Sequence, residues 1–262
     1  MKKNNDGIEM STRDFACVVL PDLDYDAQLI SIRHLLRIHE NVDNDLDREI
    51  KEIEEFARKN KGSRNMQALF EWEERLHTSI YQSAAHSMSA VGMLAPLIES
   101  IFDQAFRGIH KNLFTEKQNP SSHIRWEQSD ADKWNCHFAW GKSGRKEDLV
   151  RGIMQLSEAT GLKAFLPHDI ELVLKVLFAY RNKMFHCGFE WPVEERSRFW
   201  NRIQNESWPT NWLEKSTSGG EPWIIYLSGE FIQHCVKTIE LIIDSLGKFV
   251  CEKSGLSKQS DS

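Results

Sequence analysis

The stretch Asp169–Gly188, DIELVLKVLFAYRNKMFHCG, decides the predicted fold and carries most of the functional signal. Its apolar residues recur at steps of three, four and six, which is helical periodicity with an apolar face wide enough for a buried helix. The residues of this face are Ile170, Val173, Leu174, Leu177, Phe178 and Met184. Towards its end the pattern changes, and Arg181, Asn182 and His186 stand where core packing alone would favour aliphatic side chains.

The same periodicity predicts helices through most of the rest of the chain. They are expected over residues 24–58, 66–93, 97–114, 146–160, 192–203 and 228–251. The first range is expected to form one helix or two, with a break at the polar residues 41–45, and Pro96 is expected to break or kink the helix that reaches it. Ser228 is the expected N-cap of the last helix, and Gly188 the expected left-handed end of the 169–188 helix. The sequence therefore predicts an all-α fold, in which Trp223–Leu227 is apolar enough for a strand.

A single domain over residues 1–262 accommodates these helices. Its expected parts are an N-terminal helical extension (1–63), a polar insertion or long, partly ordered loop (115–145), the motif helix (169–188), a second insertion (189–227) and a C-terminal helix (228–251). Of the nine tryptophans, all but Trp72 lie in the two insertions. Because large aromatic side chains are rarely left in solvent, the second insertion is expected to pack over the bundle near the motif.

The composition is that of an ordinary globular chain. A net charge of −6 disfavours an avid, non-specific nucleic-acid binder, so any RNA site must be a local basic surface. Five scattered cysteines without C-x-x-C spacing favour a reducing compartment, and a cytoplasmic location is expected. Polar residues interrupt the apolar run Ile80–Phe106, and Phe15–Leu20 is too short for a signal peptide and is expected to be a short strand or a packed arm. No membrane span is therefore expected.

The sequence Arg181-Asn182-x-x-x-His186 resembles the R-x4-6-H signature of the HEPN superfamily, which places this motif near the end of a helix in a small all-α bundle. Ribonucleases of this family are metal-independent endonucleases that leave 2′,3′-cyclic phosphate ends, and many act as toxins or phage-defence effectors. The resemblance implies a HEPN-like helical bundle, RNA as substrate, no cofactor, and an antitoxin or defence-system protein as a partner. It implies catalytic roles for Arg181, Asn182 and His186.

The spacing of the motif predicts a homodimer. Arg181 and His186 are five positions apart, about 140° around a regular helix, so one chain does not bring both to one phosphate. An isologous pairing of two motif helices can gather both copies around a single cleft. Cleavage by 2′-hydroxyl attack also needs both a base and an acid, and a dimer supplies two histidines.

Each motif residue has a role that suits its chemistry. Arginine is always charged and bidentate, which suits a phosphate whose charge is concentrated in the transition state. Asn182, one turn before His186, can hold the imidazole tautomer or contact the phosphate. The alternative is structural: Arg181 and Asn182 cap the helix end, and His186 packs beside Cys187.

Other candidate sites carry less signal. The basic residues Arg196, Arg198 and Arg202 are predicted to contact RNA phosphates, or alternatively to pair with Glu194 and Glu195.

No metal site is expected, because the histidines and cysteines, including His123, Cys136 and His137, lack standard zinc spacings. Glu99 and Asp103, one turn apart, are expected on a solvated or interface face.

Two functional hypotheses remain open. The first is a metal-independent HEPN-type endoribonuclease, and the second is a catalytically inactive HEPN-like module that binds a protein or nucleotide partner.

Overall fold

The computed structural model describes residues 11–114, 123–128 and 131–255, which are mostly helical. The helical character predicted from the sequence is confirmed, and two short antiparallel hairpins accompany the helices. The helices are η1 (Asp14–Val18), α1 (Tyr25–Lys59), α2 (Ser63–Asn112), η3 (Ala131–Trp134), α3 (Leu149–Thr160), η4 (Leu162–Ala164), α4 (Ile170–Cys187), α5 (Val193–Asn205) and α6 (Gly229–Lys253). The strands are β1 (Phe138–Gly141), β2 (Gly144–Glu147), β3 (Leu213–Ser218) and β4 (Glu221–Leu227).

The chain forms two compact units, whereas the sequence predicts one domain. Unit 1 consists of Met1–Asp24, Pro96–Lys175 and Lys237–Ser262, and unit 2 of Tyr25–Ala95 and Val176–Val236. The helices α2, α4 and α6 contribute residues to both units.

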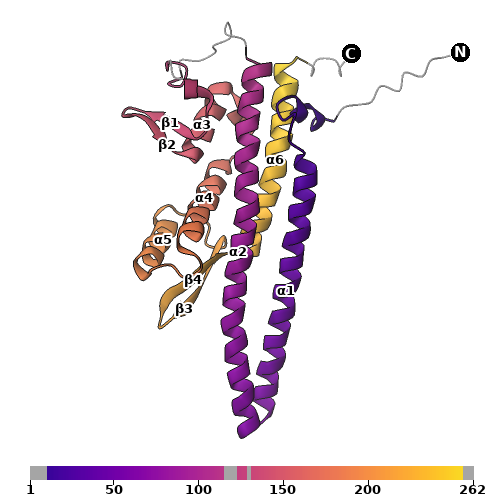
Figure 1. Cartoon of the computed structure of the whole chain (residues 1–262), viewed down its shortest axis with the longest axis vertical. Helices are drawn as coiled ribbons and strands as arrows, with labels where there is room; N and C mark the ends of the chain where they lie inside the picture. The colour runs from indigo at the N-terminus through magenta and orange to yellow at the C-terminus, as the bar shows by residue number, and fades with distance from the viewer. Residues whose placement is uncertain (1–10, 115–122, 129–130, 256–262) are drawn as a thin grey trace, which may run out of the picture. The chain divides into compact units, whose positions relative to one another are not determined.

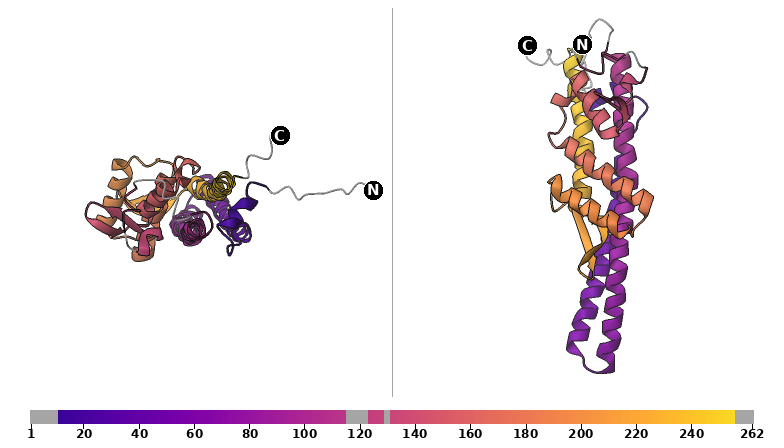
Figure 2. Two further views of the ribbon diagram at one scale, coloured as in Figure 1. Left: turned by 90° about the horizontal axis from the view of Figure 1, so that it is seen from above. Right: turned by 90° about the vertical axis from the view of Figure 1, so that its left-hand side faces the viewer.

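Unit 2 contains a long helical hairpin, in which α1 and residues 63–95 of α2 run antiparallel side by side (Figures 1 and 2). The turn is closed by the side-chain amide of Asn65, which donates to the carbonyl of Ala57 at 2.6 Å. The expected break at residues 41–45 is wrong, because α1 is continuous. Asn41, Asn44 and Asp45 are exposed, so their polar side chains reach water without interrupting the buried face that resumes at Leu46.

Pro96 lies inside α2 without ending it, so of the break or kink expected there the break is wrong. Proline removes one hydrogen bond of the helix, and its ring is exposed here while the neighbouring Ala95, Leu97 and Ile98 are buried. Packing on both sides of the proline therefore outweighs the single lost bond. The boundary between the two units nevertheless falls at this residue.

By length and composition alone, one stretch of α2 is apolar enough to cross a membrane. Half of that stretch is buried within the structure, and an internal core helix passes the same test. The absence of a membrane span stays a prediction.

Unit 1 includes the N-terminal residues from Ser11 onward. The run Phe15–Leu20 belongs largely to η1, and Val19 and Leu20 are buried, so the packed arm is confirmed rather than the strand. Gly108 of α2 permits this approach, because a Cβ atom there would lie 2.3 Å from the carbonyl oxygen of Val19. In the same unit, residues 96–112 of α2 run beside residues 237–253 of α6 (Figures 1 and 2).

Arg125 organises the insertion that precedes β1. Its side chain is fully buried and donates to four backbone carbonyls. The acceptors are the oxygens of Lys133, Asn135, Phe138 and Gly152. Burial lowers the pKa of Arg125 to about 10, so the guanidinium stays charged at neutral pH. The sequence predicts that the 115–145 insertion is partly ordered. Its described residues beyond position 130 form η3, β1 and the start of β2.

The close approach of α3 to this insertion predicts a steric effect at Gly152. A Cβ atom there would lie 2.0 Å from the carbonyl oxygen of Cys136, a backbone atom that cannot turn away. Gly152→Ala is expected to destabilise the protein by roughly 1–3 kcal/mol, although alanine favours helices. Chemical denaturation followed by circular dichroism measures the change.

The matched control is Gly92→Ala, also inside a helix. The nearest atom to a Cβ there is Cζ of Phe185 at 3.5 Å, an ordinary contact. This variant should be neutral or more stable by about 0.5–1 kcal/mol. Equal stabilities of the two variants would contradict the close packing of α3.

Candidate functional site

The motif residues belong to the part of α4 in unit 2 and lie away from the buried face of that helix. The apolar face of this helix is closed, since Val176, Leu177, Tyr180 and Met184 have no exposed surface. Arg181 is half-buried, whereas Asn182 and His186 are exposed. The left-handed helix end is confirmed, because Gly188 has φ 69° and its N–H donates to the carbonyl of Met184 at 2.9 Å.

Among the residues that the structure describes, no motif side chain forms a hydrogen bond with a backbone carbonyl at the end of α4. Nη1 of Arg181 donates to Oδ1 of Asn182 at 3.4 Å, a long and exposed contact. Within the described ranges, the side chain of His186 has no hydrogen-bond, ion-pair or ring partner, and it is exposed. The structural alternative, with His186 packed beside Cys187, is therefore wrong for the histidine.

The 189–227 segment packs around α4, as expected from its tryptophans. Trp191 is buried, its ring lies 5.9 Å from that of Tyr180, and its indole N–H donates to the carbonyl of Gly188 at 2.8 Å. Lys183 forms an ion pair with Glu195 of α5, and this hydrogen bond lowers the pKa of the Glu195 carboxyl. The end of α4 is thus held by the segment that follows it.

An aromatic chain continues from this contact into α5 and beyond. Trp191 meets Phe199 edge-on at 5.0 Å, and Phe199 meets Trp208 at 5.7 Å. Edge-to-face pairs of this kind stabilise a packed core beyond the area that they bury. Trp191, Phe199 and Trp208 therefore form a small core beside the motif helix.

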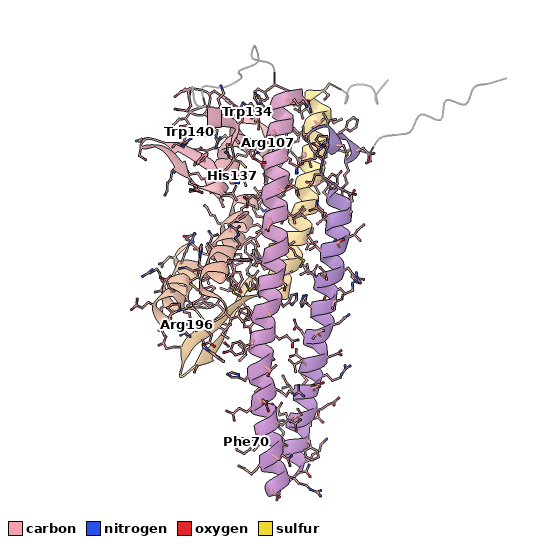
Figure 3. The ribbon with its side chains drawn as sticks, in the orientation of Figure 1. Phe70, Arg107, Trp134, His137, Trp140 and Arg196 are labelled. Carbon is pink, nitrogen blue, oxygen red and sulfur yellow. The ribbon has the colours of Figure 1, made fainter. Side chains whose placement is uncertain are left out.

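The three arginines of α5 have different surroundings. Nη1 of Arg196, labelled in Figure 3, donates to the carbonyls of Pro222 and Trp223, each at 3.0 Å, and so holds β4 to α5. Arg198 pairs with Glu195 at 2.7 Å, in line with the salt-bridge alternative. Arg202 pairs with Glu206 at 2.7 Å and stacks over Trp208. Arg198 and Arg202 remain exposed and can still meet a phosphate.

A carboxylate–imidazole pair that the sequence did not indicate lies elsewhere in unit 2. Nδ1 of His86 lies 2.9 Å from Oδ2 of Asp43, and Gln82 donates to the other carboxylate oxygen at 2.7 Å. Burial alone would raise the pKa of Asp43, but the hydrogen bonds with His86 and Gln82 lower it below its usual value. The two residues are 43 positions apart in the sequence, and no short sequence pattern predicts that they pair.

This pair lines a cavity of about 380 Å³ whose wall is strongly acidic. The acidic residues of the wall are Glu40, Asp43, Asp47, Glu214 and Glu230. Five carboxylates repel a polyanion, so the cavity is unsuited to RNA.

Among the described residues, one group of side chains lies close enough together to hold a metal ion, and it belongs to unit 1. It comprises Asp103, Cys136 and His137. Burial, together with the nearby carboxylates of Asp103 and Glu99, raises the pKa of the Cys136 thiol to about 12.

No protein-family model, curated protein or solved structure matches the chain. The resemblance to the HEPN superfamily therefore rests on the motif and its helical setting.

The different surroundings of Arg196 and Arg198 predict different effects on stability. Arg196→Ala leaves two carbonyls without their donor and should cost roughly 1–3 kcal/mol. Arg198→Ala removes only a surface ion pair and should cost less than about 1 kcal/mol. Urea denaturation of both variants measures the difference. If Arg198→Ala proves the more damaging, the roles assigned to the two residues are reversed.

Proposed function

We propose that the protein is a metal-independent endoribonuclease of HEPN type, in which Arg181, Asn182 and His186 carry catalysis. The observation that supports it is the state of the motif: its guanidinium, amide and imidazole stand at the surface of a helix whose other face is completely buried. The exposure of Asn182 and His186, with Arg181 half-buried beside them, supports a role in substrate binding rather than in the core.

The proposed reaction is attack of a ribose 2′-hydroxyl on the adjacent phosphorus. A base takes the 2′-hydroxyl proton, the 2′-oxygen bonds to phosphorus, and the 5′-oxygen leaves with a proton from an acid. The products are a 2′,3′-cyclic phosphate and a 5′-hydroxyl. Histidine suits both proton transfers near neutral pH, and Arg181 would stabilise the charge on the phosphate oxygens. Asn182 would orient the imidazole or bind the phosphate.

The proposal includes a homodimer, because Arg181 and His186 diverge by about 140° on one helix. Two large apolar side chains beside the motif support it: Phe185 is 54% exposed and Val193 is 59% exposed. The proposed dimer would remove both of these apolar side chains from water. A second copy that covers these residues would bring a second histidine and a second arginine to the motif.

RNA contacts beyond the motif are proposed for Arg198 and Arg202, whose guanidinium groups remain exposed. Arg196 would act indirectly, by holding β4 against α5. The cytoplasmic location and an antitoxin or defence-system partner are part of the same proposal, as is the role of toxin or phage-defence effector.

The second hypothesis, an inactive HEPN-like module that binds a protein or nucleotide, has one observation in its favour. The acidic cavity beside the Asp43–His86 pair lies in the same unit as the motif and suits a cationic ligand better than RNA. An unreactive motif with tight binding of such a ligand would favour this hypothesis.

The catalytic roles predict the effect of single substitutions. His186→Ala and Arg181→Ala should each fold and lose about 10² to 10⁴ in cleavage rate, because each removes acid–base or electrostatic help. Asn182→Ala should lose less, since water can replace part of an orienting contact. The measurement is cleavage of a mixed RNA pool in buffer without added divalent metal, with analysis of the product ends.

The matched control is His34→Ala, an exposed histidine of α1 in the same unit. It should cleave as fast as the wild type and yield the same cyclic phosphate ends. A requirement for magnesium, or full activity of His186→Ala, would refute the mechanism.

The dimer predicts a separate effect at Phe185. Phe185→Asp places a charge in the proposed interface, so this variant should be monomeric at concentrations where the wild type is a dimer, and it should lose cleavage with the dimer. Ile30→Asp is the control, because Ile30 is 68% exposed on α1 and should leave the dimer intact. Light scattering reads the oligomeric state of all three proteins. A strictly monomeric wild type at micromolar concentration would exclude the dimer.

A further inference from the structure

Unit 1 brings together two pairs of residues that are separate in the sequence. Glu99 and Asp103 stand one turn apart on α2, and Cys136 and His137 directly precede β1. Nε2 of His137 lies 2.9 Å from Oε1 of Glu99, and one ligand atom each of Asp103, Cys136 and His137 lies within 4.8 Å of the others. Figure 3 shows His137 beside α2, on the side that faces β1.

We propose that Asp103, Cys136 and His137 form a binding site for a zinc-class transition metal ion, with Glu99, which lies against His137, as the fourth ligand. A thiolate, an imidazole and two carboxylates are ligands that zinc accepts, and four of them complete a tetrahedral structural site. The Cys136 thiol would release its proton to solvent as the sulfur binds the metal. Because the motif of α4 lies in unit 2, this ion would join α2 to the β1 segment of unit 1 and take no part in cleavage.

The contacts of His137 fit a metal ligand. Its Nδ1 lies 2.9 Å from Oδ1 of Asn135, and the same oxygen accepts the backbone N–H of His137 at 2.9 Å. When Nδ1–H donates to this amide, Nε2 presents its lone pair towards the Glu99 carboxylate, as in histidines that bind zinc while donating their other ring N–H. Zinc bonds to nitrogen and oxygen near 2.1 Å would place these two atoms about 3.4 Å apart. The observed 2.9 Å needs only a small opening.

The backbone around Cys136 and His137 is held in advance. Arg125 donates to the carbonyls of Asn135 and Phe138, which flank the pair on both sides. Cys136 has no exposed surface, so the site is closed to solvent on the side of its sulfur. Glu99, Asp103 and His137 are half-buried, so the other side is open to solvent. An ion can therefore enter from solvent and meet ligands that are already positioned.

One cation already contacts the site. Arg107, also labelled in Figure 3, pairs with Oδ2 of Asp103 at 3.0 Å. Its side chain is 76% exposed, so solvent screens this pair and the guanidinium can turn outward when a metal takes its place.

Cobalt titration of the full chain tests the site. Protein is reduced, stripped of metal with a chelator and titrated with Co²⁺, whose bond to a thiolate produces near-ultraviolet charge-transfer absorption. The wild type should bind one equivalent with this absorption, and Zn²⁺ should displace the cobalt. Cys136→Ser should lose the absorption, and His137→Gln and Asp103→Asn should weaken binding at least about tenfold.

Cys251→Ser is the control, because Cys251 also belongs to unit 1 but lies outside the cluster, and it should behave as the wild type. If Cys136→Ser fails to fold, the variants at the half-buried His137 and Asp103 still test the site. The site is refuted if stoichiometric Co²⁺ produces no thiolate absorption, or if His137→Gln binds cobalt as tightly as the wild type does.

Discussion

The structure around the motif depends on a buried hydroxyl that joins β4 to α4. Tyr180 is completely buried, so its O–H needs a partner, and it donates to the carbonyl of Ile225 at 3.1 Å. Burial also raises the pKa of this phenol, which keeps it a donor. The bond ties β4 to α4 one residue before Arg181. With that face of the helix committed to the core, the next residues of the turn are directed to the surface, where the proposed chemistry needs them.

Much of this local structure could be predicted from the sequence, because it is encoded by neighbours. Gly188 ends α4, Pro192 directly precedes α5, the Ser228 hydroxyl accepts the N–H of Phe231 at 3.1 Å as an N-cap, and Trp223 lies in β4. Local signals failed where packing outweighed them, as at Pro96, where one lost hydrogen bond did not end α2. Helix propensity alone does not tell whether tertiary packing will outweigh a helix-breaking residue.

Contacts between distant residues could not be predicted. The carboxylates of α2 and the Cys136–His137 pair carry no shared pattern, and they lie together in a fold where Arg125 holds the backbone on both sides of that pair. The same holds for the Asp43–His86 pair. The three arginines of α5 have similar sequence contexts but different partners. The sequence predicts one common role in RNA binding, whereas Arg196 makes a structural contact and Arg198 and Arg202 are exposed.

The central claim is that the surface-exposed motif of α4 cleaves RNA through its 2′-hydroxyl. The most direct measurement uses a short RNA that the protein cuts at one position, compared with the same strand carrying a single 2′-deoxynucleotide immediately 5′ of that phosphate. Removal of the attacking oxygen should abolish cleavage of the substituted strand, while the unsubstituted strand is cut as before. Continued cleavage at the deoxy-substituted position would show that water or another nucleophile attacks, and would contradict the proposed role of Arg181 and His186.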